Sequence, residues 1–186
     1  MVFIVGLGGS VDPDSQSERA LRAVLGAAER RGATVQAFTG AQLDLPPYHY
    51  GVHLPDGTRD YLEAVRRADG VVIASPAYHG TLSGLVKNAV DYLEELAQDE
   101  RPYLSGRAVA PVAVAKGWQA AVTTLGTLRQ VVHALRGWPT PIGLALNGSV
   151  TRFEADGSTP DENAGQLIGT VADQLIDFAE RFRTAD

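Results

Sequence analysis

Residues 70–93 read GVVIASPAYHGTLSGLVKNAVDYL. The stretch opens with a continuous apolar run over residues 70–75, which is typical of a strand buried on both faces of a parallel sheet. Pro76 interrupts that strand, and Ser83 is a residue type that caps helix N-termini. The apolar residues after Ser83 recur at helical spacing. The stretch therefore predicts a strand, a loop and a helix in direct succession.

The same succession recurs along the rest of the chain. Further strands are expected at residues 2–7, 34–38, 107–115 and 141–146. Helices with one apolar face are expected over residues 21–32, 59–68, 83–96, 125–137 and 167–182. Five strands alternating with helices predict an α/β fold, in which a parallel sheet carries helices on both faces. Ligands of such sheets bind at the carboxyl ends of the strands.

Composition narrows the function classes. The length of 186 residues suits one domain. The net charge is −6, and no Lys/Arg cluster is longer than the pair Arg66-Arg67. We therefore expect neither a nucleic acid nor a membrane as a partner. The absence of cysteine excludes disulfides, thiolate chemistry and Cys-based metal sites, so redox chemistry would need an organic cofactor. The four histidines lack a carboxylate cluster, and we expect no metal site. Met1–Gly9 has no signal-peptide features, which favours a cytoplasmic protein.

The loop after the first strand, residues 8–17, reads GGSVDPDSQS. It lacks the third glycine of a dinucleotide fingerprint and the Gly-Lys-Ser/Thr of a Walker loop. Hydroxyl groups leading into a helix N-terminus can hold a phosphate, which makes Ser10, Ser15 and Ser17 candidate ligands. No Lys or Arg lies between Gly9 and Glu18, so neutralisation would rest on N–H and O–H dipoles. The alternative is that Ser15 or Ser17 merely caps the helix.

The segment from Ser75 to Leu93 resembles the signature of the NADPH-dependent FMN reductase family. That signature is Pro-x-Tyr-Asn-Gly/His-Ser/Thr, followed by a Leu-Lys-Asn-Ala-apolar-Asp helix, and His79 stands where the family usually has Asn. The Gly9-Ser10 loop is similar to the family's phosphate-binding loop, although Asp12 replaces a frequent Arg. The resemblance implies one flavodoxin-like domain over residues 1–186, with five parallel strands in the order 2-1-3-4-5.

The resemblance also implies the residues that bind the cofactor. The phosphate of FMN would be held by Ser10, Ser15 and Ser17. The isoalloxazine, with main-chain N–H groups near its N5, O4 and N3, would be lined by Pro76, Ala77, Tyr78, His79 and Gly80. Thr81 would add a hydroxyl, and Gly117 would let the backbone close over the flavin edge.

The implied activity is an FMN-dependent NAD(P)H oxidoreductase, which passes hydride from NADPH or NADH to a small acceptor in ping-pong fashion. The acceptor would be free flavin, with a partner monooxygenase as its recipient, or a quinone or azo compound. No protein side chain is expected to act as catalytic acid or base, because the flavin carries the chemistry. Alternatives are a flavodoxin-type electron carrier without a nicotinamide site and a scaffold that has lost the cofactor. The family likeness also implies a homodimer or homotetramer, assembled through helices such as that of residues 83–97.

Overall fold

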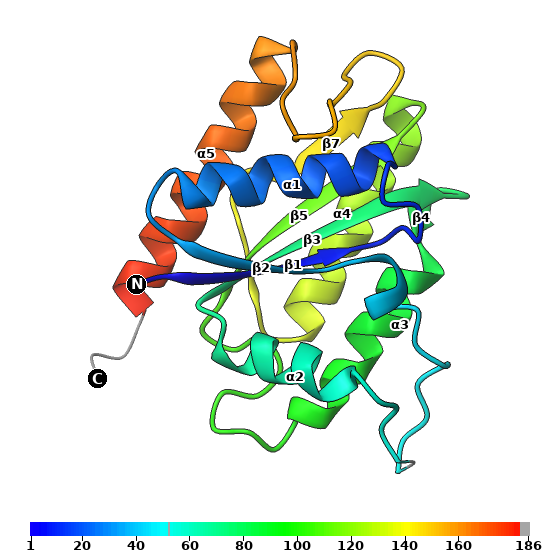
Figure 1. The fold of residues 1–186 in the computed structure, drawn as a ribbon, viewed down its shortest axis with the longest axis vertical. Helices are drawn as coiled ribbons and strands as arrows, with labels where there is room; N and C mark the ends of the chain where they lie inside the picture. Colours follow the sequence, from blue (N-terminus) through cyan, green and yellow to red (C-terminus); the bar gives the residue numbers. More distant parts are fainter. Residues whose placement is uncertain (52, 183–186) are drawn as a thin grey trace.

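The computed structural model describes residues 1–51 and 53–182, and strands and helices alternate along it as the sequence predicts (Figure 1). The elements are β1 (Phe3–Gly8), α1 (Gln16–Glu29), β2 (Thr34–Phe38), η1 (Gly40–Gln42), α2 (Thr58–Arg67), β3 (Gly70–Tyr78), β4 (Thr81–Leu82), α3 (Gly84–Asp91), η2 (Tyr92–Leu96), β5 (Ala108–Ala115), α4 (Trp118–Ala134), β6 (Trp138–Pro139), β7 (Leu144–Asn147) and α5 (Glu162–Phe182).

The sheet has the order β2-β1-β3-β5-β6, with β7 also pairing with β5, and all of these pairings are parallel. This is the flavodoxin-like order 2-1-3-4-5 that the family likeness implies. The strand count differs, because the described sheet has seven strands rather than five. One addition is β4, which pairs antiparallel with the end of β3.

The other addition is β6, which precedes the strand expected at residues 141–146; the part of that expected strand that forms lies within β7. β6 pairs with Ala108–Val109 at the start of β5, and β7 pairs with Val112–Ala115 at its end. Pro139 ends β6 and Pro141 lies between β6 and β7, and neither has an N–H to give to a strand neighbour. The two strands nevertheless occupy a single position in the sheet, next to β5.

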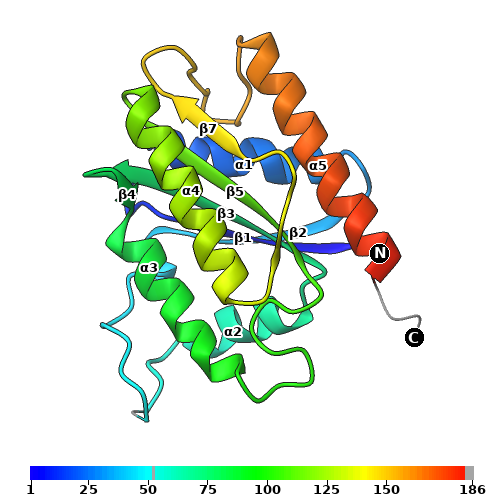
Figure 2. The ribbon, with the colours of Figure 1, turned by 180° about the vertical axis from the view of Figure 1, so that it is seen from behind.

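Helices cover both faces of the sheet (Figures 1 and 2). The core on one face packs α1 and α5 against side chains such as Val72 and Ala74 of β3. The core on the other face packs α2, α3 and α4 against Val71 and Ile73. This alternation along one strand is the pattern of a doubly covered parallel sheet. Its consequence for function is that the strand ends stay uncovered at the edge where the βα loops gather.

Arg107, at the entrance to β5, is a fully buried cation. Its guanidinium donates to five backbone carbonyls, those of Arg66, Ala68, Arg101, Tyr103 and Ser105. Burial lowers its pKa to about 10, so the group stays protonated at neutral pH. It thereby ties the C-terminal end of α2 to the loop that leads into β5.

Replacing Arg107 with Met should lower the free energy of unfolding by at least about 2 kcal/mol. Each buried carbonyl that is left without a hydrogen bond costs about 1–3 kcal/mol. Urea titration measures the loss. Arg129→Met is the matched control, since Arg129 donates a hydrogen bond to the carbonyl of Pro141 on an exposed surface. The control should stay within about 1 kcal/mol of the parent chain. Equal losses in the two variants would contradict the role assigned to Arg107.

Candidate functional site

A cavity of about 600 Å³ lies at the carboxyl ends of the strands. Its lining comes from the loops after β1, β3, β5 and β7, and consists of Ser15, Gln16, Ser17, Pro76, Ala77, Tyr78, Val114, Ala115, Lys116, Gly117, Ala120, Gly148 and Arg152. The volume is in the range of small-molecule sites, which are about 300–1,000 Å³. Serine hydroxyls mark the end at α1, whereas proline, alanine, valine and tyrosine form the walls at β3 and β5.

The end at α1 is formed by a capped helix N-terminus. The Oγ of Ser15 accepts the N–H of Glu18 at 3.3 Å and lies 3.1 Å from the Oγ of Ser17. The capping role considered for Ser15 is therefore correct. The N–H groups of Gln16 and Ser17 belong to the first turn and have no acceptor within the helix. The cavity thus meets the positive end of the helix dipole, which favours an anion.

Ser10 is placed differently from the other two serines. It is buried and does not line the cavity. Its N–H donates to Oε1 of Glu18 at 3.1 Å, and its Oγ accepts the N–H of Asp12 at 3.1 Å. These bonds shape the loop. A direct contact between Ser10 and a phosphate stays a prediction.

Glu18 is the buried acid beneath this loop, with 1% of its surface exposed. Its carboxyl fills the space above Gly8, where a Cβ atom would come within 2.3 Å of Oε2. Among the described residues, Oε2 has no hydrogen-bond partner. Burial raises the pKa of the carboxyl to about 7, outweighing the hydrogen bond from Ser10. The sequence indicated Glu18 only as an acidic residue in the first helical turn, since neither periodicity nor spacing reveals what the loop covers.

The loop after β3 is a tight hairpin. β3 continues to Tyr78, past the end expected at residue 75, and pairs with β4. The two residues at the turn, His79 and Gly80, have φ values of 52° and 85°. Two consecutive positive φ values are typical of hairpin turns and favour Asn, Asp or Gly, and His also tolerates them better than most residues. His79 can therefore replace the family's usual Asn without a change of turn geometry.

Of the ten residues expected to bind FMN, six line the cavity: Ser15, Ser17, Pro76, Ala77, Tyr78 and Gly117. Ser10, His79, Gly80 and Thr81 are not part of the lining. Tyr78 is 55% exposed and provides a flat aromatic surface beside Pro76 and Ala77. At Gly117 an added Cβ would meet no atom within 4 Å, so the backbone there borders open space.

The loops after β1 and β3 are joined by Ser83, the N-cap of α3. Its Oγ donates to the carbonyl of Gly9 at 2.8 Å and accepts the N–H of Val86 at 3.2 Å. Its own N–H donates to the Oγ of Ser75 at 2.9 Å. A Cβ at Gly9 would come within 2.9 Å of Pro76, so the two loops are in direct contact. The serine end and the flat end of the cavity are therefore held in fixed relation.

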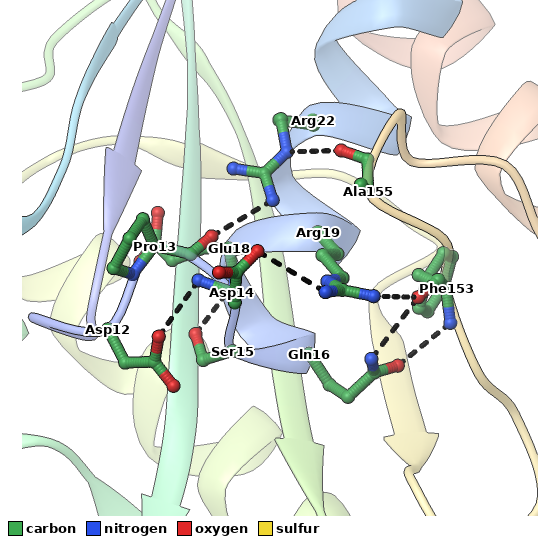
Figure 3. Close-up of polar contacts among 10 residues, drawn as sticks. All are labelled: Asp12, Pro13, Asp14, Ser15, Gln16, Glu18, Arg19, Arg22, Phe153 and Ala155. Atoms are coloured by element: carbon green, nitrogen blue, oxygen red, sulfur yellow. Dashed lines mark hydrogen bonds and ion pairs between the residues drawn. The ribbon is translucent and has the colours of Figure 1, made fainter.

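A fourth segment, after β7, reaches the cavity through Gly148 and Arg152. The sequence indicated only a loop in this region. Gln16 exchanges two hydrogen bonds with the backbone of Phe153, at 2.8 and 3.2 Å, and Arg19 donates to the same carbonyl at 3.0 Å (Figure 3). The signal that could have drawn attention to Arg152 is its position just beyond a strand end at the ligand-binding edge of the sheet.

Metal-binding clusters and membrane-spanning helices are both absent from the described residues. The described residues hold no group of three or more His, Asp or Glu side chains that could bind a metal ion. Every helix in the described part of the chain is too short or too polar to cross a membrane.

Comparison with known proteins agrees with this geometry. The family model described as NADPH-dependent FMN reductase matches residues 2–151. The NAD(P)H-dependent FMN reductase PA1204 of Pseudomonas aeruginosa is 26% identical over 190 residues, which cover 98% of this chain and 97% of that protein. The NADPH azoreductase of a Bacillus strain is 29% identical over 145 residues, which cover 74% of this chain and 76% of that one.

Among solved structures, FerB of Paracoccus denitrificans, a flavoenzyme NAD(P)H:(acceptor) oxidoreductase, superposes with a TM-score of 0.79. The match covers 98% of this chain and 99% of FerB at 19% sequence identity. At that identity the likeness supports the fold.

The burial of Glu18 predicts a pH-dependent stability. The folded chain keeps this carboxyl protonated up to about pH 7, whereas unfolding returns its pKa to the ordinary 4.5. Its stabilising contribution is therefore fully present below about pH 4.5 and is lost as the pH rises through about 7, a loss of at most about 3 kcal/mol. Because Glu18→Gln stays neutral, this variant should gain stability relative to the parent chain between about pH 5 and pH 8.

Urea titrations across this pH range measure the effect. Glu29→Gln, on the exposed end of the same helix, is the control and should show a difference from the parent chain that hardly changes with pH. A pH-independent difference for Glu18→Gln would contradict the assignment of a raised pKa to this residue.

Proposed function

The chain belongs to the NADPH-dependent FMN reductase family, and we propose that its cavity holds FMN with the phosphate at the N-terminus of α1 and the isoalloxazine beside the β3–β4 hairpin. The protein is an FMN-dependent NAD(P)H oxidoreductase. When bound, FMN supplies the chemistry of hydride transfer between NADPH or NADH and a small acceptor. The chain itself has to bind, orient and shield that group.

The observation that carries the orientation is the division of the cavity into two unlike ends. At α1, the hydroxyls of Ser15 and Ser17 and the free N–H groups of the first turn favour an anionic group. At the other end, Pro76, Ala77 and Tyr78 offer a flat and largely apolar wall. Flavin mononucleotide has the same division, with a phosphate at one end and a planar ring system at the other.

Main-chain groups are the proposed polar partners of the ring. The pairing of β3 with β5 ends at Pro76 and Val114, and β3 then continues into the wall of the cavity. This supports a role for the backbone N–H groups near Ala77 and Tyr78 in binding the pyrimidine end of the flavin. The proposed role of His79, Gly80 and Thr81 is then to set the conformation of the hairpin. The hydroxyl of Thr123 in α4 donates a 2.9 Å hydrogen bond to the carbonyl of Gly80 and so stabilises this turn.

Backbone donors held in a fixed position beside the ring would contribute to catalysis, because preorganised donors would stabilise negative charge on the reduced flavin. Neither an acid nor a base is assigned among the side chains of the cavity wall. The exposed face of Tyr78 lies where a second planar molecule, a nicotinamide or an acceptor, could approach. A free flavin, a quinone or an azo compound is the proposed acceptor, and the relatives described as azoreductases favour including azo compounds.

Three finer features of the function stay predictions. They are assembly into a homodimer or homotetramer through α3 and η2, a cytoplasmic location, and delivery of reduced flavin to a partner monooxygenase. The exposed ion pair between Lys87 and Asp91 on α3, with N–O distances of 2.6 and 2.8 Å, would lie at such an interface.

The activity is tested by following the oxidation of NADPH and NADH by the chain reconstituted with FMN. Free FMN, a quinone and an azo dye are added in turn as acceptors. We expect oxidation with at least one acceptor, and the preferred one defines the subclass. Bound FMN without oxidation of either nicotinamide under all conditions would overturn the reductase function in favour of an electron carrier.

The orientation is tested by adding a side chain where the structure leaves room for one. Gly117→Leu should fold normally, because an added Cβ meets no neighbour. It should weaken FMN binding about ten-fold or more, since forcing a bulky group into a filled site costs about 1–3 kcal/mol. Flavin fluorescence titration and thermal unfolding measure the two quantities.

The matched control is Gly126→Leu, at an exposed position of α4 where an added Cβ is equally free of contacts. Its FMN affinity should equal that of the parent chain. If Gly117→Leu also bound FMN as tightly as the parent chain, Gly117 would not border the cofactor.

A further inference from the structure

At the end of the cavity proposed for the phosphate, the nearby loop supplies negative charge and no positive charge. A phosphate monoester carries about −1.5 to −2 charges at neutral pH. The loop that should receive it contributes the carboxylates of Asp12 and Asp14, and no Lys or Arg lies between Gly9 and Glu18. Asp14 is neutralised by Arg19, at 3.3 Å, while within the described chain Asp12 has no ion pair. The positive end of the α1 dipole therefore faces acidic side chains as well as the phosphate, and a cation from another part of the fold is needed.

Two cations line the cavity, Lys116 and Arg152. In the described residues, neither side chain has a hydrogen-bond or ion-pair partner. The other arginines near the loop are already bound: Arg19 donates to Asp14 and to the carbonyl of Phe153, and Arg22 donates to the carbonyls of Pro13 and Ala155. A cation for the phosphate must therefore come from Lys116 or Arg152.

The backbone next to Arg152 is fixed to the N-terminus of α1. Phe153 donates its N–H to Oε1 of Gln16 at 2.8 Å, and its carbonyl accepts Nε2 of Gln16 at 3.2 Å (Figure 3). The Phe153 side chain is buried with 2% exposure and anchors the segment in the core. The carbonyl of Arg152 accepts the hydroxyl of Thr159 at 2.7 Å. These contacts fix the backbone on the C-terminal side of Arg152 at the first turn of α1, and Arg152 itself lines the cavity.

Lys116 is held in a different place. It precedes Gly117 at the end of β5, and its carbonyl accepts the hydroxyl of Ser149 at 2.9 Å. No described contact ties it to the first turn of α1. Its position is that of the wall assigned to the ring system, so Arg152 is the better placed of the two cations.

We propose that Arg152 binds the phosphate of FMN at the N-terminus of α1, and that Gln16 is the residue that positions it. The inference rests on the proposed function. A guanidinium brings a full positive charge and can donate two parallel hydrogen bonds to phosphate oxygens, whereas a helix N-terminus offers N–H groups and only about half a charge. The cation lies 134 residues downstream of Glu18, beyond the reach of any pattern in the loop itself.

The test compares FMN with riboflavin, which has the same ring but no phosphate. Dissociation constants are measured by flavin fluorescence for the parent chain and for Arg152→Gln. FMN should bind about ten-fold more weakly to the variant, and riboflavin should bind as before, because the lost interaction is a hydrogen bond to a charged group. Arg59→Gln, at an exposed position of α2, makes the same change in net charge and should alter neither affinity.

Gln16→Ala tests the positioning role through the ratio of the two affinities. It should lower the preference for FMN over riboflavin, but less than Arg152→Gln does. In the double variant the preference should fall no further than in Arg152→Gln alone, because the two residues act on one contact. Additive losses would overturn the positioning role of Gln16.

Other outcomes overturn the role of Arg152 while leaving the proposed function intact. One is an equal loss of affinity for FMN and riboflavin, which would indicate a general disturbance of the cavity. Another is an unchanged FMN affinity combined with a raised KM for NADPH but not NADH, which would assign Arg152 to the nicotinamide cofactor. If the parent chain binds neither flavin, the proposed function fails, and this inference fails with it.

Discussion

The hydrogen bond from the hydroxyl of Ser83 to the carbonyl of Gly9 joins two loops that are 74 residues apart. Both loops end parallel strands, and the sheet alone would leave their tips free to move relative to each other. Ser83 also caps α3, and its N–H donates to the hydroxyl of Ser75, so one side chain connects the helix, the hairpin and the loop after β1. The spacing between the serine end and the flat wall of the cavity depends on this junction.

The N-terminus of α1 is the second organising element. Ser15 caps it, Glu18 supports the loop from below, and Gln16, Arg19 and Arg22 reach across to the segment after β7. The helix therefore connects the loop after β1 to the segment after β7, and it also presents N–H groups to the cavity. An insertion or a deletion in the first helical turn would rotate these side chains away from their partners and disturb all of these contacts at once.

The sequence identified the elements that repeat locally. Apolar runs gave the sheet strands, Ser15 and Ser83 were recognised as cap types, and the segment after residue 70 carried enough of a family pattern to imply FMN. Errors arose where local patterns are silent. The strand expected at residues 141–146 begins only at Leu144, and the short strand β6 forms before it at residues 138–139. The hairpin at His79 extends β3 beyond the proline expected to end it.

What the sequence by itself determined is the α/β class and, through the family likeness, the strand order; six of the residues that the likeness implies for FMN also line the cavity, while their contact with FMN stays a prediction. Only the tertiary structure decided the surroundings of the cavity end at α1, where Glu18 is buried under the loop and Arg152, far downstream in the sequence, joins the cavity lining. The physical reason is the separation along the chain of the residues that are in contact. Periodicity and capping reflect contacts within one element, whereas Gln16 meets Phe153 across 137 residues because the sheet brings its strand ends to a common edge.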